Sequence, residues 1–441
     1  MNAIKYSKKP FDPSKWPFFY GWIIILMGTL GILMSIPGQT IGVSTFTDSL
    51  IKVLSLSRNQ ISLAYMIGTI LSSLLLTKAG ELYDSHGVRF VAGIGSFALG
   101  LSLIFLSQVD KIIDWLNLSG QIIPTVVIMI LGFSMIRFFG QGVLTLASKT
   151  MMMKWFDARR GFATSFSSAF TALGFSASPY FFELLIQKYD WNGAWLILGT
   201  ISALVFPVIV IVFFRNNPQD VGLSPDGGVI TKKERKLRFP VLKEFSLPEA
   251  RRQLVFWVIS LLLAMQALFI TGFTFHVVSI FDSAGISRSE ALSIFPPIAI
   301  VSVASILIFG WLSDYVKLRL LLFCKGFAAI ASLAGLIFLK DYDFARYIII
   351  IGIGTMAGLF GVITIVAWPR LFGKIHLGAI NGFCMTLIVF GSALGPMLFS
   401  ISKSHTGNYI LADIISLVLF LGLTLMVFKI ENPQSLLQEK V

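Results

Sequence analysis

Residues 80–89 read GELYDSHGVR, and this short polar stretch lies between two apolar runs, residues 61–77 and 90–106. Each run is long enough to cross the roughly 30 Å hydrocarbon core of a bilayer as a helix. The stretch between them is too short for a domain and too polar to be buried in lipid. It therefore predicts a tight turn between two membrane helices.

The same turn returns much later, in residues 310–319, GWLSDYVKLR. The two copies share four residues at equal spacing, Gly80, Leu82, Asp84 and Arg89 against Gly310, Leu312, Asp314 and Arg319. A second pattern also repeats, because Gly161 precedes Pro179 by the same interval as Gly378 precedes Pro396. A half-chain repeat in an apolar protein is typical of a transporter built from two bundles.

The composition agrees with a membrane protein, since 56% of the residues are hydrophobic and 13% are charged. Soluble domains carry about 25% charged residues. The apolar residues form continuous runs, whereas strands of a membrane barrel alternate. We therefore expect an all-α integral membrane protein with twelve transmembrane helices, at residues 18–44, 61–77, 90–106, 122–148, 161–186, 193–214, 254–279, 291–310, 320–339, 345–367, 379–402 and 409–428.

These helices divide into two six-helix bundles related by a pseudo-two-fold repeat. The expected parts are an N-terminal segment 1–17, a first bundle 18–214, a linker 215–252, a second bundle 253–428 and a C-terminal segment 429–441. The linker contains NNPQD, SPDGG and KKERK, so we expect a surface segment, partly disordered or lightly helical near 242–254. Residues 232–238 are either a solvated part of this linker or a basic patch for anionic lipid headgroups.

The net charge of +13 is compatible with nucleic-acid binding, but the positions of the charged residues argue against that function. Of the 35 Lys and Arg residues, 26 fall in the two terminal segments and in alternate loops, and 8 fall in the other loops. This bias places both termini in the cytoplasm, for a multi-pass protein of the plasma or inner membrane. Lys325 is counted with a cytoplasmic loop here, and Arg137 is the remaining charge inside a span.

Three features resemble the major facilitator superfamily. The first turn matches that family's loop signature at Gly80, Leu82, Asp84, Gly87 and Arg89, while Ser85 and Val88 replace two of its basic residues. Residues 137–142, RFFGQG, are similar to its motif in the fourth helix. Residues 173–179 and 391–396 are similar to its Gly/Pro motif in the fifth helix. The resemblance implies a secondary active transporter with the major facilitator fold.

Within that superfamily, residues 137–179 and the segment FTFHVVSIFDSAGIS resemble the monocarboxylate and oxalate–formate transporter group. Members of that group commonly place a cation in the eighth or eleventh helix to hold the substrate carboxylate. Residues 294–309 and 379–402 contain no Lys or Arg, so this chain departs from that pattern.

The duplicated turn is a candidate gate. Asp84 and Arg89 can pair with each other, with a helix end or with a neighbouring helix, and a contact made in only one conformation biases a two-state motion. The plain alternative is a turn that only caps two helices. The gating candidates are Gly80, Asp84, Gly87, Arg89, Gly310, Asp314 and Arg319.

Arg137 is the first candidate for binding substrate. Burying an arginine in a bilayer costs at least about 2.5–3.5 kcal/mol, so its side chain should face water or a partner. Gln141 and Thr145 follow on the same helix face. The alternative is a structural arginine bonded to first-helix carbonyls near Gly28 or Gly31. Further cavity candidates are Ser35 and Gln39 beside the Pro37 break, Gln266 and Thr364.

Two residues are candidates for proton coupling. His276 lies near the outer end of the seventh span, and histidine changes protonation between pH 5 and 8. Its alternative is a satisfied interfacial histidine. Glu183 is the second candidate, and its alternative is an ion pair with Lys188. Asp413 is a weaker candidate, because in the superfamily the twelfth helix usually faces lipid.

We find no zinc pair, nucleophile elbow or phosphate loop outside the apolar runs, and we expect no enzyme activity, cofactor or metal. The sequence favours a monomeric transporter of a small organic solute, most simply an organic anion such as a monocarboxylate, working by alternating access with H⁺ as a coupling candidate. The first alternative is an exporter of amphipathic compounds or a carrier of a neutral metabolite. A second is a sensor or lipid-handling protein that does not transport.

Overall fold

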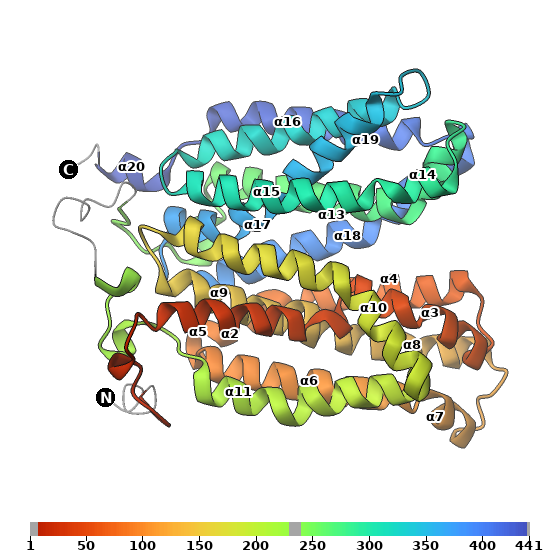
Figure 1. Cartoon of the computed structure of the whole chain (residues 1–441), viewed down its shortest axis with the longest axis horizontal. Coiled ribbons are helices and arrows are strands. Elements are labelled where there is room, and N and C mark those ends of the chain that lie inside the picture. The colour runs from red at the N-terminus through yellow and green to blue at the C-terminus, as the bar shows by residue number, and fades with distance from the viewer. Residues whose placement is uncertain (1–7, 229–239, 439–441) are drawn as a thin grey trace. The chain divides into compact units, whose positions relative to one another are not determined.

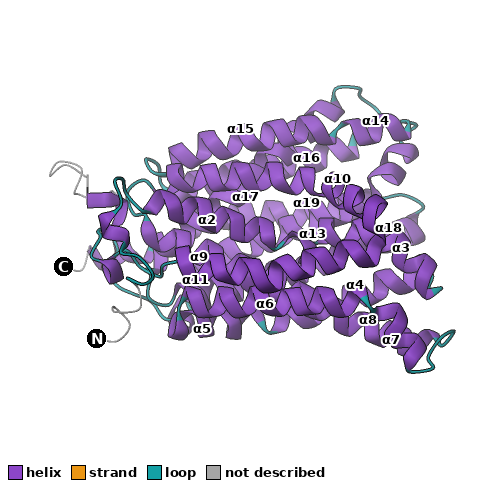
Figure 2. Cartoon of the chain, turned by 60° about the horizontal axis from the view of Figure 1, so that its bottom comes forward, coloured by secondary structure: helices purple, strands orange, loops and turns teal. Residues whose placement is uncertain are grey.

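A computed structural model describes residues 8–228 and 240–438 of the chain. Within these residues the regular structure is helical throughout, and no strand occurs (Figure 2). A helix pairs its own backbone groups, which a chain in hydrocarbon must do. The prediction of an all-α fold is confirmed. The expected basic patch at 232–238 lies outside the described residues.

The chain divides into two compact units. Unit 1 comprises Met1–Asp157, Phe170–Thr231 and Asn381–Thr386, and unit 2 comprises Ala158–Ala169, Lys232–Ile380 and Leu387–Val441. The expected bundle boundaries at residues 214 and 253 stay a prediction.

A glycine allows one close helix contact in unit 1. α6 and α11 lie side by side (Figure 1), and a Cβ on Gly100 of α6 would come within 2.4 Å of the Ala203 nitrogen, in the π-helical segment Ile201–Val205 that precedes α11. The helices are α2 (Gly21–Met34), α3 (Thr40–Leu54), α4 (Arg58–Leu74), α5 (Leu76–His86), α6 (Val88–Ser107), α7 (Val109–Trp115), α8 (Ile122–Ile136), α9 (Thr145–Trp155), α11 (Phe206–Phe213) and the larger part of α10 (Arg160–Thr200).

Unit 2 is built around a long central helix, α17, which packs along both α15 and α16. Glycines on α17 allow this close packing, since a Cβ on Gly352 or Gly358 would press on α16 or α15. The helices are α12 (Leu247–Ala250), α13 (Leu254–Ser283), α14 (Arg288–Ser293), α15 (Phe295–Ser313), α16 (Leu318–Ile337), α17 (Ala345–Phe372), α19 (Ile410–Met426), α20 (Pro433–Gln438), the start of α10 and most of α18 (Leu377–Thr406).

Among the described residues, nine helices are long and apolar enough to cross a membrane, or ten if the bent pair Asn59–Leu74 and Leu76–His86 is one span. The expected number was twelve. Two of the expected spans form one continuous run, Arg160–Phe213, with a non-helical backbone at Asp190 inside it. The first expected span is split into α2 and α3, so neither piece reaches the required length.

The split in the first span follows from its sequence. Pro37 cannot continue the helix, and Ile36–Gly38 forms one 3-10 turn between α2 and α3. Gly38 lies so close to the neighbouring helix that a Cβ there would come within 2.2 Å of the Ile136 carbonyl oxygen. The break therefore brings the Gly38 backbone directly against the end of α8.

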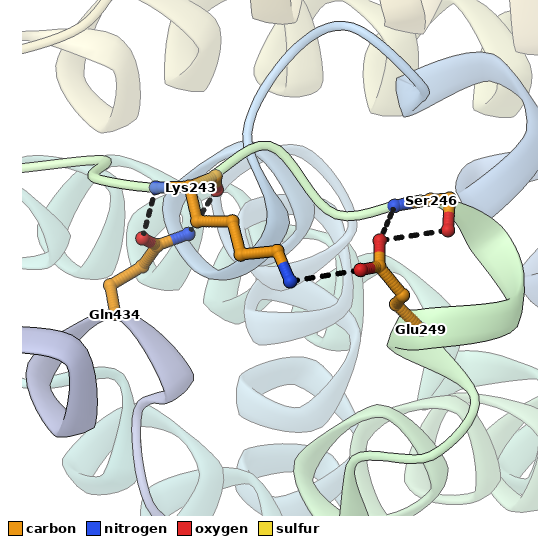
Figure 3. A network of polar contacts seen from close by, with 4 residues as sticks. All are labelled: Lys243, Ser246, Glu249 and Gln434. Atoms are coloured by element: carbon orange, nitrogen blue, oxygen red, sulfur yellow. Dashed lines mark hydrogen bonds and ion pairs between the residues drawn. The ribbon is translucent and has the colours of Figure 1, made fainter.

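Residues 242–254 of the linker, expected to be partly disordered or lightly helical, contain the short helix α12 and are held by side-chain contacts. Figure 3 shows Gln434 of α20 bound to Lys243, whose N–H donates to the Gln434 Oε1 atom at 3.0 Å. The Ser246 N–H donates to Glu249 at 2.8 Å and caps α12. The Lys243 ammonium, 2.8 Å away, and the hydrogen bonds from Ser246 together lower the pKa of the Glu249 carboxyl to about 2. These contacts fix the linker to the end of α17, because Gln434 also donates to the Leu371 carbonyl.

Candidate functional site

Arg137 lies at the point where α8 changes into a π-helical segment, Arg137–Leu144. Such segments are frequent at functional sites. The side chain is 1% exposed. One terminal nitrogen, Nη1, donates to the Gly38 carbonyl at 3.4 Å and to Thr40 Oγ1 at 3.3 Å. The guanidinium carbon lies 5.1 Å from the centre of the Tyr65 ring, so an aromatic face covers part of the charge.

The other two nitrogens of Arg137 are not satisfied. Nε and Nη2 are buried and have no hydrogen-bond partner among the described residues. A guanidinium has five donors and no acceptor, so only an oxygen or another acceptor can complete it. Within the same residues, Arg137 forms no ion pair with a carboxylate. Arg137 is therefore a candidate site for an anion.

The alternative interpretation of Arg137 was a structural bond to a carbonyl of the first expected span. The structure confirms the span, and the predicted carbonyl was wrong. Arg137 binds the carbonyl of Gly38, at the break, instead of one near Gly28 or Gly31. Gly28 packs on Met152 and Gly31 packs on Ser148 of α9. The break decides this, because only there does a carbonyl leave the helical ladder and become free to accept.

Ser35 and Gln39, both expected in the cavity, meet across the break with Thr145. The Thr145 hydroxyl donates to Ser35 Oγ at 3.0 Å, and the Gln39 amide nitrogen donates to Ser35 Oγ at 3.0 Å and to Thr145 Oγ1 at 3.2 Å. This network is buried and lies next to the Arg137 contact at Gly38. Gln141 is half-buried on the π-helical segment, and its Oε1 atom has no partner among the described residues.

Unit 2 contains a buried cation that the sequence interpretation missed. Lys325 was counted with a loop, but it lies well inside α16 and is 0% exposed. Its ammonium donates to the Oε1 atom of Gln266 on α13, lies 3.5 Å from the Met356 carbonyl oxygen and sits 5.3 Å from the centre of the Phe360 ring. Its position inside a long apolar run was the signal that could have identified it.

The hydroxyl of Thr364, another cavity candidate, donates to a carbonyl of its own helix. Thr364 is 3% exposed and donates to the Phe360 carbonyl at 2.9 Å. Ser and Thr hydroxyls in membrane helices commonly bond in this way. Within the described residues Thr364 makes no hydrogen bond to Gln266, so the structure does not join these two candidates.

The surroundings of His276 favour a structural role. Its Nε2 atom lies 3.1 Å from the Pro396 carbonyl oxygen, and because a carbonyl only accepts, Nε2 carries the proton. Its Nδ1 atom lies 3.4 Å from the Tyr409 hydroxyl. The ring is parallel to Phe399 at 6.3 Å. These contacts agree with the alternative interpretation, in which both ring nitrogens of His276 have partners within the protein.

Glu183 is exposed on α10, and its carboxylate accepts from Gln187 at 3.1 Å. Among the described residues it forms no ion pair with Lys188, whose ammonium lies over the Tyr189 ring. The expected pair fails because residues five apart lie on different sides of a helix, whereas residues four apart are neighbours.

Asp413 is more buried than its helix suggested. It was expected near lipid, but its side chain is 2% exposed, and its Oδ1 atom has no partner among the described residues. It lies in the first turn of α19, four residues after Tyr409, whose hydroxyl lies 3.4 Å from His276 Nδ1. The side chain therefore faces the inside of unit 2.

The two turns dock their arginines in the same manner. Arg89 Nε donates at 2.8 Å to the carbonyl of Phe214, directly after α11. Arg319 Nη2 donates to the carbonyl of Ile430, directly after the 3-10 turn Val427–Lys429 that continues α19. Each arginine thus binds the negative end of a helix dipole. Gly80 is buried. Asp84, which lies between Gly80 and Gly87 in the sequence, is half-buried.

Asp314 caps the first turn of α10. Its carboxylate accepts the N–H groups of Gly161 at 2.8 Å and Phe162 at 2.9 Å. Gly310 and Gly161 make this approach possible, because a Cβ on Gly310 would come within 2.5 Å of Ser165. Burial raises the pKa of the Asp314 carboxyl to about 6, against the opposing effect of the two N–H groups.

No group of three or more His, Cys, Asp or Glu side chains that could hold a metal ion occurs in residues 8–228 and 240–438.

Residues 19–396 match the family model described as Major Facilitator Superfamily. The chain belongs to this superfamily. It is accordingly a multi-pass integral membrane protein and a secondary transporter, and not an enzyme.

Among curated proteins, the chain is similar to "Monocarboxylate transporter 12" of Xenopus laevis, with 24% identity over 309 residues. The match covers 65% of this chain and 66% of that protein, which is just under two thirds of the relative's own length.

Solved structures of the same fold cover nearly all of the chain. The proton:xylose symporter XylE has 16% identity and a TM-score of 0.65, with 93% of this chain and 95% of that chain covered. The E. coli fucose:proton symporter FucP has 13% identity and a TM-score of 0.66, with coverages of 93% and 98%. A bacterial homologue of the iron transporter ferroportin has 16% identity and a TM-score of 0.65, with coverages of 92% and 98%. These likenesses support the fold alone.

Proposed function

We propose that this transporter moves a small organic anion, such as a monocarboxylate, by alternating access. The observation that carries the proposal is Arg137, a buried cation whose Nε and Nη2 donors have no partner among the described residues. A carboxylate offers two oxygens at the spacing of this donor pair, and such charge-assisted pairs are stronger than neutral hydrogen bonds. The similarity to a monocarboxylate transporter supports the same substrate class.

The site around Arg137 is suited to hold the guanidinium still. Its third nitrogen is tied to Gly38 and Thr40, and Tyr65 supports the arrangement by donating to Thr40 Oγ1 at 2.9 Å. A cation held in one position loses little freedom when a ligand binds, which favours affinity. The neighbouring network of Ser35, Gln39 and Thr145 satisfies its own groups and fixes the break that supplies the Gly38 carbonyl.

A neutral or amphipathic substrate is the alternative, and the absence of Lys and Arg from residues 294–309 and 379–402 favours it. Proton coupling stays a prediction. The contacts of His276 and Glu183 give it no added support, because His276 is bound to the Pro396 carbonyl and Glu183 accepts from Gln187.

The test is a thermal-shift measurement on the detergent-purified protein with acetate, L-lactate, pyruvate and benzoate, at neutral and mildly acidic pH. A ligand that binds the folded protein raises its melting temperature by mass action. We expect stabilisation by at least one carboxylate in the wild type. Arg137→Ala should weaken binding by about 10- to 100-fold, as expected for a lost hydrogen bond to a charged group.

Two variants control this experiment. Arg137→Lys keeps the charge but not the two-pronged donor geometry, and we expect it to recover only part of the affinity. Arg252→Ala removes an exposed arginine and should leave binding unchanged. Stabilisation by neutral or amphipathic compounds only, equal in wild type and Arg137→Ala, would exclude the organic-anion proposal and leave Arg137 as a structural residue.

A further inference from the structure

Lys325 and Gln266 form a buried polar pair in unit 2, and the proposed function does not explain it. Lys325 is 0% exposed and Gln266 is 5% exposed. Among the described residues, no carboxylate pairs with Lys325. A buried membrane cation is costly, so charged groups at such positions are usually functional.

The direction of the hydrogen bond between Lys325 and Gln266 is fixed by their chemistry. A lysine ammonium has three donors and no acceptor, so the side of the Gln266 amide that faces it must be the oxygen. The hydrogen bond from Lys325 to Gln266 Oε1 follows this rule. The assignment of oxygen and nitrogen within the amide is thus set by the partner, as it must be for any Gln side chain.

The other end of the same amide is unused. No hydrogen bond from the Gln266 amide nitrogen to another described residue is formed. Its two N–H donors point away from Lys325, because the amide is planar. The side chain therefore presents donors only, and the cation behind it polarises those donors further.

Lys325 is held in this position by two contacts besides Gln266. Its ammonium approaches the Met356 carbonyl and lies over the face of Phe360, both on α17. A cation–π contact becomes stronger when it is shielded from water. These contacts keep the ammonium beside Gln266 when a ligand arrives, so the amide cannot turn to present its oxygen.

We propose that Lys325 is a positioning residue for substrate recognition, which fixes Gln266 as a donor-only contact for an oxygen of the substrate's carboxylate. Gln266 is the contact, and Lys325 acts through it. This inference rests on the proposed function, since it assumes an anionic substrate. It adds that unit 2 discriminates a carboxylate from the corresponding amide, which would present its own N–H donors to those of Gln266.

The experiment compares acid and amide forms of one ligand. Dissociation constants of acetate, L-lactate, pyruvate and benzoate, and of their primary amides, are measured by thermal shift on the purified full-length protein. In Lys325→Met the amide of Gln266 is free to turn. We expect the preference for acid over amide to fall by about tenfold or more, which is the value of one well-placed hydrogen bond.

Three further variants separate positioning from a purely structural role. Lys325→Arg keeps a donor-only cation and should restore the preference. Gln266→Glu replaces the amide with an acceptor that pairs with Lys325, and it should abolish carboxylate binding. Lys340→Met, at an exposed lysine after α16, should change nothing. A lysine that only stabilises the fold would alter the melting temperature and leave the acid-to-amide ratio unchanged.

The outcomes separate this inference from the function on which it rests. A folded Lys325→Met protein with an unchanged ratio overturns the inference, while the organic-anion proposal survives if Arg137→Ala still loses carboxylate binding. If no carboxylate binds the wild type, both are overturned. If Lys325→Met does not fold, Gln266→Ala decides, because an unchanged ratio in that protein excludes Gln266 as the contact.

Discussion

The two copies of the turn end on the same arginine, and they differ two residues before it and again six residues after it. Arg89 binds the carbonyl of Phe214, which follows α11, and Arg319 binds the carbonyl of Ile430, which follows α19 and its terminal 3-10 turn. Two residues before each arginine stand Gly87 and Lys317, and six residues after it stand Gly95 and Lys325. The shared residue performs one task twice, and the differing residues mark where the units have different structures.

The difference before the arginine is one of backbone conformation. Gly87 has φ 79° and ψ 174°, a region that only glycine adopts readily, whereas Lys317 has φ −64° and ψ 140°, which any residue adopts. The second turn therefore does not need the second glycine of the family signature, and the lysine there is no defect.

Six residues after the arginine, unit 1 has a close packing contact and unit 2 has a buried charge. In unit 1 a Cβ on Gly95 would come within 2.7 Å of Val143 Cγ1 of the π-helical segment. In unit 2 the matching position holds the buried Lys325. In unit 1 the candidate cation, Arg137, lies on another helix and has two buried nitrogens without a partner among the described residues. Each unit thus has its own polar centre, built from a different helix of the repeat.

The largest expected effect is at Gly95. Gly95→Leu inserts a side chain into a closed contact with Val143, and overpacking of this kind costs about 3 kcal/mol. Unfolding in mixed detergent and denaturant micelles measures it. Gly93→Leu is the matched control, because a Cβ at Gly93 meets nothing within 4 Å. Equal stability of the two variants would remove packing as the reason for the difference between Gly95 and Lys325.

The next effect is a pH dependence at Asp314. Burial raises the pKa of its carboxyl from 3.8 to about 6, so between these values the folded protein holds a proton that the unfolded chain releases. The contribution of Asp314 to stability therefore falls as pH rises through this window, by about 2–3 kcal/mol in total.

Melting temperatures of wild type and Asp314→Asn, measured from pH 4 to 7, test this dependence. We expect the difference, wild type minus variant, to decrease between pH 4 and 6 and then to stay constant. Asp341→Asn, at an exposed aspartate, should show no such trend. A difference that increases with pH would mean that the N–H groups of Gly161 and Phe162 outweigh burial.

The smallest pair of effects separates the two turns themselves. Gly87→Ala forces a side chain into a glycine-only backbone region and should cost about 2 kcal/mol. Lys317→Ala occupies an ordinary region at an exposed site and should stay within about 0.5 kcal/mol. The same micelle unfolding assay measures both. A large loss in Lys317→Ala would show that the second turn depends on the lysine side chain.

The sequence by itself determined the membrane class, the superfamily and the repeated turn. These follow from local properties, since the length of an apolar run decides whether a helix can span and a turn signature is read within ten residues. It also singled out Arg137, because an arginine inside an apolar run is visible without any structure. The break at Pro37 was equally visible, since proline cannot continue a helix.

The tertiary structure decided which groups those residues meet. Only the fold places Gly38 against Arg137, leaves Nε and Nη2 without a partner, and turns Lys325 from a presumed loop charge into a buried contact of Gln266. It also gave His276 a carbonyl partner and buried Asp413. These facts depend on atoms far apart in the chain, and no local pattern contains the distances on which hydrogen bonding and desolvation depend.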